Sequence, residues 1–401
     1  MVFPTRFVNV DAARREFGEA ADRLAAALSR TDPAAEAVVA AFGRLAPGRG
    51  KEMLDQALAH GIETVEDAPD ALVELFERLD RVPPWVDWDA MQRGAAMYLR
   101  HGPLGAGVIG CFSAPIMYSS PAGNKPLIFS SRLVQKAPRR MTETAHFVLE
   151  TSRPGGLRRF ADGFRITVKV RLMHAQVRRL LARSERWKWE QWGAPLNQAD
   201  LAGTNLALSA LIVEGLERLG FHITAEERDG FVQLWRYVGY LLGIEAELLC
   251  ATYAEAARMQ RLIDLTQQGP DDDARALIDA LRNATLPPPL HIINKARGPY
   301  AAVCRYMLGD QRADALGYPR TAWRHAIPLL RAGVWALDSA RRLTPGADAA
   351  LVRACTRMYE KAIHTGLEGQ RPEYAMPEAL RKSVVARRTV VQGSLRALEG
   401  A

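Results

Sequence analysis

The chain has 401 residues, of which 48% are apolar and 24% are charged. This composition is ordinary for a globular protein and excludes wholesale disorder, because enough apolar surface is present to offset the entropy of ordering the chain. Lys and Arg number 53 against 45 Asp and Glu, so the formal net charge is +8. A positive balance of this size permits acidic partners without requiring them.

Helical periodicity dominates the sequence, and strand-like alternation is scarce. In chain order we expect helices at about 9–30, 33–45, 50–59, 69–79, 88–111, 138–151, 165–186, 198–219, 224–242, 246–266, 272–283, 297–307, 320–341, 347–366 and 376–398. No fixed repeat period and no Gly/Ser linker divides the chain. These observations predict an all-α fold and a single large helical domain over residues 1–401.

The four cysteines (Cys111, Cys250, Cys304 and Cys355) lie far apart and form no CxxC or CxxCH motif. We therefore expect reduced thiols and a reducing compartment. The first residues contain no long apolar segment followed by a small-residue cleavage site, so we expect no signal peptide. Both observations predict a cytoplasmic location.

Residues 102–124 carry no charge but include Pro103, Pro115 and Pro121. A membrane-spanning helix needs about 20 mostly apolar residues without such breaks, so we expect a buried helix followed by a loop and no stable membrane insertion. Residues 105–110 also match GxGxxG. A helical pattern precedes them where a dinucleotide-binding motif needs a strand, so close helix packing through small residues is the favoured interpretation.

The segment from Arg178 to Trp189 interleaves cations with aromatic residues, a pattern that can follow a nucleic-acid backbone. The cluster is short and isolated. A helix end with a solvated basic face and tryptophans packed beneath it is therefore the preferred interpretation, and we expect no nucleic-acid partner.

The most informative segment is the helix around His174. At about 100° per residue, one apolar arc contains Ile166, Val170, Met173, Val177 and Leu181. His174 stands at the edge of this arc, and Arg171 and Arg178 flank it three and four residues away.

An imidazole between an apolar stripe and two guanidinium groups suits a haem wall, because iron takes a neutral imidazole nitrogen and arginines can pair the propionates. A lone histidine at such a boundary is more often a core or surface residue. The pattern alone leaves both interpretations open.

Several further motifs surround this segment in the sequence. They are Ser131-Arg132-Leu133, the run from Arg139 to Phe147, Pro154-Gly155-Gly156, the run from Val170 to Arg178, the run from Trp192 to Thr204, the run from Trp235 to Ile244, and the run from Arg305 to Gly317. In this order they resemble the latex clearing protein (rubber oxygenase) family, which includes the fungal oxygenase that cleaves the farnesyl chain in mycophenolic acid biosynthesis. The resemblance covers about residues 90–320, and Arg171 to Arg178 (RLMHAQVR) is its most specific part.

The resemblance implies a globin-like helical core, at about residues 90–320, that holds non-covalent haem b. It implies that the segments 1–89 and 321–401 are helical extensions, and that His174 is the axial ligand of the iron. Members of the family use O₂ to split carbon–carbon double bonds into carbonyl products.

The family carries an Arg-x-x-Lys-Thr stretch over the open face of the haem. Arg140 and Thr144 match this stretch, and Glu143 stands in place of the lysine. The resemblance therefore implies that Arg140 and Thr144 polarise oxygen or orient substrate, and that the iron is five-coordinate or water-bound at rest. Glu143 is either a proton-transfer group or a surface glutamate that pairs with a neighbouring arginine.

Asn197 and Thr204, which follow the His174 helix in the sequence, have simple local interpretations. Asn197, three residues before Asp200, is a helix N-cap signature. Thr204 either faces the haem or bonds back to its own helix.

We therefore expect a haem b-dependent oxygenase that uses O₂ on carbon–carbon double bonds of a small isoprenoid or lipid-like molecule. Three alternatives remain open. They are a haem peroxidase or peroxygenase, a haem gas sensor without turnover, and a haem-free helical protein that binds nucleic acid. The sequence leaves the oligomeric state open.

Overall fold

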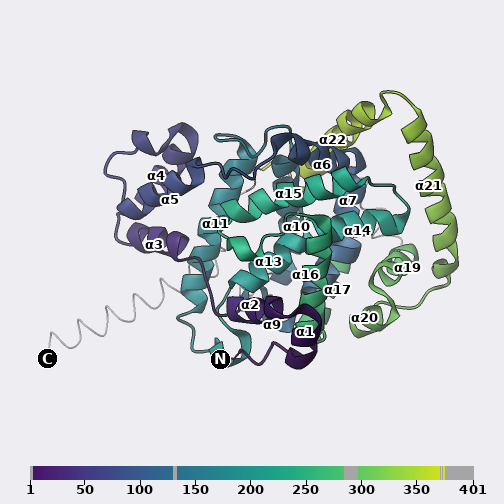
Figure 1. The fold of residues 1–401 in the computed structure, drawn as a ribbon, viewed down its shortest axis with the longest axis horizontal. Helices are drawn as coiled ribbons and strands as arrows, with labels where there is room; N and C mark the ends of the chain where they lie inside the picture. The colour runs from purple at the N-terminus through teal and green to yellow at the C-terminus, as the bar shows by residue number, and fades with distance from the viewer. Residues whose placement is uncertain (1–2, 130–132, 284–296, 371, 373, 375–401) are drawn as a thin grey trace.

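The computed structural model describes residues 3–129, 133–283, 297–370, 372 and 374. Every regular element in these residues is a helix, which confirms the predicted all-α class (Figure 1). In the view of Figure 1, α11, α13 and α15 lie towards the centre of the molecule, α3, α4 and α5 lie to one side, and α21 lies at the opposite edge.

The N-terminal helices are α1 (Val10–Phe17), α2 (Glu19–Ala27), α3 (Pro33–Phe42), α4 (Arg49–His60), η1 (Ile62–Thr64) and α5 (Asp70–Asp80). They are followed by α6 (Trp88–His101), α7 (Pro103–Val108), the π-helical turn η2 (Ile109–Ser113), α8 (Ala114–Tyr118), α9 (Pro121–Phe129), α10 (Leu133–Ser152) and α11 (Asp162–Leu181). The next group is α12 (Trp189–Trp192), α13 (Gln198–Ala207), α14 (Ala210–Leu219), α15 (Ala225–Leu241), η3 (Ala246–Leu248), α16 (Tyr253–Thr266) and α17 (Asp272–Asn283). The last group is α19 (Arg297–Leu308), α20 (Asp310–Ala315), η4 (Ala322–Ala326), α21 (Ile327–Leu343) and α22 (Ala347–Gly366).

Side-chain caps begin several of these helices, because the first amides of a helix have no partner within it. Asn197 caps α13 by accepting the amide of Asp200 at 2.9 Å, as its position in the sequence predicts. Thr224 and Glu227 form a reciprocal capping box at the start of α15. These local signals place the ends of α13 and α15, whose side chains shape the centre of the fold.

The uncharged stretch 102–124 is helical for most of its length, so the expectation of a loop after one buried helix is wrong. The chain turns at Gly102, with φ of 38°, and continues through α7, η2, α8 and α9. Pro103, Pro115 and Pro121 stand in the first turn of α7, α8 and α9. Proline is tolerated in a first turn, because its missing amide would have no intrahelical partner there.

Within the GxGxxG match, only part of the packing expectation is confirmed. A Cβ atom added at Gly105 would lie 2.6 Å from the ring of Tyr98, so this glycine lets α7 approach α6. Gly110 has open space around its Cβ direction and serves no such contact. Helix α6 precedes the motif, where dinucleotide binding needs a strand.

Other boundaries differ from the expected ones. The helix expected at 198–219 is divided into α13 and α14 at Leu208 and Ser209, and α11 ends at Leu181. The helix expected at 376–398 lies outside the described residues. Residues Gln198–Leu219 together are long and apolar enough to cross a membrane, but 78% of the apolar window is buried in the protein, as in a core helix.

Helices α6 and α15 cross at two glycines. A Cβ atom at Gly94 would lie 2.0 Å from the amide nitrogen of Phe231, and one at Gly230 would lie 2.2 Å from the carbonyl oxygen of Ala90. The two backbones therefore touch, which no larger residue would permit. This crossing fixes α15 against the body of the protein.

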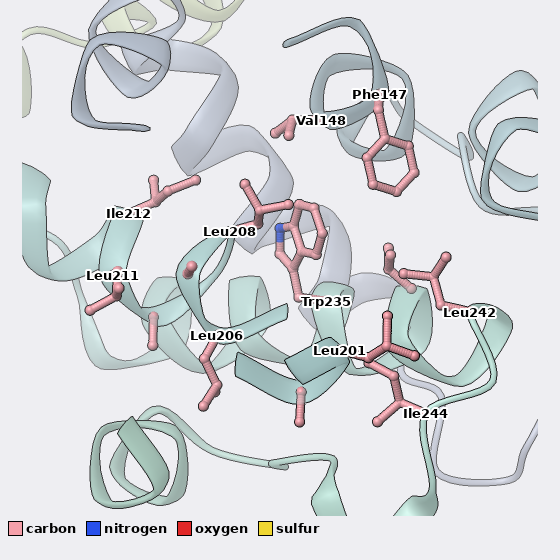
Figure 2. Close-up of a cluster of buried hydrophobic side chains, with 14 of the residues drawn as sticks. Phe147, Val148, Leu201, Leu206, Leu208, Leu211, Ile212, Trp235, Leu242 and Ile244 are labelled. Atoms are coloured by element: carbon pink, nitrogen blue, oxygen red, sulfur yellow. The ribbon is translucent and has the colours of Figure 1, made fainter. Parts of the chain in front are cut away.

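Trp235 of α15 occupies the centre of the core (Figure 2). Its ring meets that of Phe147 from α10 edge-on, with 5.9 Å between centroids. Around it lie apolar side chains that include Val148, Leu201, Leu206, Leu208, Leu211, Ile212, Leu242 and Ile244 (Figure 2). Leu201 and Leu211 also border the internal cavity described next, so the core forms one of its walls.

Candidate functional site

A cavity of about 980 Å³ opens among α8, α9, α10, α11, α13, α16, α17 and α20. Its volume stands at the upper end of the range of about 300–1,000 Å³ that is common for ligand pockets. The apolar part of its wall includes Ile116, Met117, Leu127, Leu201, Ala207 and Leu211. This cavity brings together four of the residues predicted as a site: Arg140, Thr144, His174 and Thr204.

His174 borders the cavity from α11, and its Nδ1 atom is buried without a hydrogen-bond partner in the described part of the chain. Burial lowers the pKa of His174 to about 4, and the positive charges of Arg178 and Arg140 add to this effect. The imidazole is therefore neutral near pH 7. A neutral ring nitrogen at the wall of a large cavity can act as a metal ligand.

Arg140 and Thr144 lie four residues apart on α10, on the same side of this helix, and both border the cavity. Tyr118 of α8 borders it as well. Burial raises the pKa of the Tyr118 hydroxyl, and the charge of Arg140 partly offsets this rise. This part of the wall thus offers one guanidinium and two hydroxyl groups to a bound molecule.

Thr204 of α13 bonds back to its own helix, as one of its two predicted interpretations has it, and it also borders the cavity. Its Oγ1 atom donates to the carbonyl oxygen of Asp200 at 2.9 Å, one turn earlier in the same helix. The residue is exposed, and it borders the cavity. Thr204 therefore contributes to the cavity wall while its hydroxyl remains bonded to its own helix.

The structure places Arg171 and Arg178 outside the cavity wall, in ion pairs. Arg171 is 8% exposed and donates from Nε to Asp32 at 2.7 Å. Arg178 is 3% exposed and donates to Glu36 at 3.1 Å and to the carbonyl oxygen of Leu196 at 3.0 Å. Carboxylates of the protein already occupy both guanidinium groups, so the structure gives no support to their expected role with haem propionates, which stays a prediction.

Glu143 also lies outside the cavity wall. Its Oε1 atom accepts from Nε of Arg139 at 3.1 Å, which is the surface ion pair that the sequence left open as an alternative. The position of Glu143 in the structure gives no support to a role in proton transfer within the cavity.

Three carboxyl groups that sequence analysis did not select as site residues border the cavity instead, those of Asp200, Asp264 and Asp310. Asp200 forms a two-pronged pair with Arg6, whose Nη atoms lie 2.6 and 2.9 Å from its oxygens. Asp264 of α16 lies beside Gln260 at 3.2 Å and Arg312 at 3.3 Å, and its burial raises the pKa of its carboxyl group. No local motif marks Asp264, because it reaches the site only through the packing of α16 and α20.

The described residues contain no group of three or more His, Cys, Asp and Glu side chains that could hold a metal ion. His174 would supply one nitrogen ligand to a group that brings its own remaining ligands, as haem does. Its unpartnered Nδ1, its neutral ring and the large adjoining cavity fit such a group.

The basic and aromatic segment near Trp187 is only partly as expected. Trp187 is buried and donates from Nε1 to the carbonyl oxygen of Gly193 at 2.9 Å. Trp189, which was expected to pack beneath the helix end, is 49% exposed. Arg186 lies over the ring of Phe129, with 4.7 Å to the centroid, so part of the basic face is engaged within the protein.

Comparison with known proteins agrees with the sequence resemblance. Residues 88–339 match the family model described as ER-bound oxygenase mpaB/B'/Rubber oxygenase, catalytic domain. A rubber oxygenase from Streptomyces sp. (strain K30) is 25% identical over 314 residues, which make up 72% of this chain and 73% of that protein.

The solved structure of latex clearing protein in the closed state superposes with a TM-score of 0.60. The match covers 88% of this chain and 95% of that chain at 21% identity, and it shows a shared fold. The family model spans more than half of the sequence. The chain therefore belongs to the oxygenase family that comprises the mpaB-type enzymes and the rubber oxygenases.

Proposed function

We propose that the protein is a haem b-dependent oxygenase that uses O₂ to cleave a carbon–carbon double bond of a small unsaturated molecule. The observation that carries this proposal is the neutral imidazole of His174, with an unpartnered Nδ1, at the wall of a cavity of about 980 Å³. Membership of an oxygenase family supports the same reaction class.

His174 would hold the iron through a nitrogen of its neutral imidazole. Haem b, when bound, supplies the iron at which O₂ is activated. Arg140 and Thr144 would donate hydrogen bonds to oxygen or to substrate from α10. Leu201 and Leu211 would exclude water around the alkene. The overall reaction is balanced, since one C=C bond and one O₂ give two carbonyl groups.

The size of the cavity supports a small substrate. The space of about 980 Å³ is shared with the cofactor, which leaves room for an isoprenoid or lipid-like molecule of moderate size. We further propose a cytoplasmic location, which the free state of Cys111, Cys250, Cys304 and Cys355 supports. Fractionation of cells that express the full chain tests this location.

The absorption spectrum of the purified, haem-supplied protein tests the cofactor. We expect a Soret band that is lost in His174→Ala and retained in His146→Ala. His146 is a suitable control because it lies on α10, is half-buried and is not part of the cavity wall. Equal loss of the band in both variants would contradict the assignment of His174.

Oxygen uptake with unsaturated isoprenoids and fatty acids, followed by analysis of carbonyl products, tests the reaction. A haem-loaded protein that is inert towards every alkene but binds O₂ or CO reversibly would point to a gas carrier or sensor. Turnover with hydrogen peroxide in place of O₂ would point to a peroxygenase. A protein without a Soret band after haem supply, which shifts DNA in a salt-dependent way, would overturn the proposal.

A further inference from the structure

A second hollow, of about 390 Å³, lies among α19, the start of α20, the residues around η4 and the start of α21. Figure 1 shows these elements at one edge of the molecule. Among the described residues, its wall contains four arginines but a single acidic side chain: Arg305, Arg320, Arg324, Arg331 and Asp310. We call this hollow the arginine cleft. An excess of one charge in a concave surface attracts ligands of the opposite sign.

Carboxylates of the protein already pair with two of the four arginines. Arg305 is 8% exposed and pairs with Asp310 and with Asp314, whose Oδ1 atom lies 2.5 Å from Nη1 of the arginine. Arg320 donates from Nη2 to Asp314 at 2.8 Å. The remaining positive charge of the cleft therefore lies on the other two side chains.

Arg324 and Arg331 form no ion pair within the part of the chain that the structure describes. Arg324 donates from Nε to Nε2 of His325 at 3.2 Å. The guanidinium of Arg331 lies over the ring of Tyr306, 5.7 Å from its centroid, and the hydroxyl of this ring donates to the carbonyl oxygen of Arg218 at 3.1 Å. The contact with the ring positions Arg331 and leaves its N–H groups available to a carboxylate or a phosphate.

Helix α21 strengthens the preference of the cleft for an anion. The helix begins at the cleft, where Ile327 and Pro328 are part of the wall, and no side chain caps its first turn. The positive end of its dipole therefore adds to the charge of the two unpaired arginines.

The arginine cleft and the cavity meet at Gly309 and Asp310, which border both. A Cβ atom added at Gly309 would meet no atom beyond its chain neighbours within 4 Å, so the space beside this residue is open. On the cavity side, the adjacent Leu308 is part of the wall, as are Leu277 and Leu281 of α17. One hollow thus suits an apolar chain, and the other suits an anion.

The geometry favours a single anionic group over a larger acidic partner. A nucleic-acid strand needs a basic track that follows its backbone. The two unpaired arginines instead border one space of about 390 Å³. A substrate that is wholly hydrocarbon would make no use of their charge.

We propose that the arginine cleft holds the anionic end of the substrate, which is an unsaturated chain that ends in a carboxylate or a phosphate. The chain passes Gly309 into the cavity, and Arg324 and Arg331 pair with the charged end. The two arginines determine specificity and take no part in the oxidation. This inference rests on the proposed function for the role of the bound molecule as a substrate, whereas the binding itself needs no turnover.

Equilibrium dialysis with the purified, haem-supplied full-length protein tests this proposal. The ligands are oleyl alcohol, oleate and oleyl phosphate, which share one unsaturated chain and differ only in its end. Oxygen is excluded, so that no turnover occurs. At low ionic strength we expect both anions to bind at least about tenfold more tightly than the alcohol, and added salt should reduce this difference. The tighter of the two anions identifies the preferred end group.

A pair of double variants tests the two arginines. Arg324→Gln/Arg331→Gln should weaken binding of the anions by about tenfold and change binding of the alcohol by less than about twofold. Arg342→Gln/Arg353→Gln is the matched control, because it removes the same charge from exposed residues that border neither hollow. All four side chains are exposed, so neither variant should alter the thermal unfolding curve.

Three outcomes would overturn the proposal. The first is equal affinity for all three ligands, and the second is an equal effect of the two double variants. The third is a preference for anions that is lost in Arg140→Gln and kept in Arg324→Gln/Arg331→Gln. The charged end would then lie beside Arg140, which borders the cavity and whose charge acts on His174.

The same ligands separate this inference from the proposed function. Turnover of neutral alkenes by a protein with no preference for anions would overturn the inference and leave the oxygenase function intact. Tight binding of anions that depends on Arg324 and Arg331, without oxidation of any alkene, would contradict the oxygenase function and support the arginine cleft as an anion site.

Discussion

Arg171 donates two hydrogen bonds to the carboxylate of Asp32, from Nε to Oδ2 at 2.7 Å and from Nη2 to Oδ1 at 3.0 Å. Asp32 also caps α3 by accepting the amide of Ala35 at 3.2 Å. The pair therefore ties the helix of His174, less than one turn away, to the N-terminal part of the protein.

Removing one member of this pair should destabilise the fold. Arg171→Met leaves the buried charge of Asp32 without its partner, and we expect the free energy of unfolding to fall by about 3–5 kcal/mol. Arg165→Met, which breaks a more exposed pair with Asp162 at 3.4 Å, should change it by less than about 1 kcal/mol. Urea unfolding of the three proteins measures the difference. An Arg171→Met protein of unchanged stability that no longer binds haem would instead support a role with the propionates.

The helix crossing at Gly94 should tolerate no larger residue. In Gly94→Ala, the new methyl group would lie 2.0 Å from the amide nitrogen of Phe231 and 2.3 Å from the carbonyl carbon of Gly230. Backbone atoms cannot move aside as a flexible side chain can, so we expect a loss of about 3 kcal/mol or more in unfolding free energy. Gly110→Ala, which meets open space, is the matched control. Equal thermal midpoints for both variants would show that α6 and α15 can separate at low cost.

Buried histidine should make the haem-free protein less stable in acid. Burial lowers the pKa of His101 to about 4, although its Nδ1 atom lies 2.8 Å from the carbonyl oxygen of Met97. Between about pH 6.5 and pH 4, the unfolded chain binds a proton that the folded chain does not. The free energy of unfolding should therefore fall as the pH falls through this window, by about 3 kcal/mol for this one group.

Urea unfolding of the haem-free protein at about pH 7 and about pH 5 measures this slope. His101→Gln should be less stable than the unchanged protein at neutral pH but should lose less stability on acidification. His174, with a pKa also lowered to about 4, contributes in the same direction in both proteins. A slope that is unaffected by the substitution would show that His101 does not titrate in this window.

The cavity-facing side of α10 should matter for turnover, and its outer side should not. Arg140→Gln and Thr144→Val each remove a donor from the cavity wall, and we expect kcat to fall by about 10- to 100-fold. Glu143→Gln should keep kcat within about twofold, because Glu143 pairs with Arg139 outside the cavity. Steady-state oxygen uptake compares the three. A large loss in Glu143→Gln alone would restore the proton-transfer interpretation.

The cavity residues also show how much of the candidate site can be predicted from the sequence. His174, Arg140, Thr144 and Thr204 lie in three helices that border one cavity, and sequence motifs are sufficient to select all four. Their roles in catalysis remain predictions. The partners of Arg171 and Arg178 were missed because Asp32 and Glu36 lie about 140 residues earlier in the chain, and no local pattern encodes such a pairing.

The ends of the helices were predicted less well than the all-α class of the fold. The prolines at 103, 115 and 121 were read as breaks in a helix, although each stands where a new helix begins. A first-turn proline and a helix-ending proline look alike in the sequence, and tertiary packing decides between them. The carboxyl group of Asp264 was overlooked for a similar reason, since only the packing of α16 brings it to the cavity.

The wall of the cavity runs in sequence from Arg6 to Ala315. A site of this kind exists only when nearly the whole chain has folded, so a partly synthesised or partly unfolded protein has no ligand site to offer. Whatever fills the cavity binds the folded state alone and shifts the folding equilibrium by mass action. The abundance of the protein in the cell should therefore follow the supply of its ligand. The protein without ligand unfolds more often and is degraded more readily by proteases.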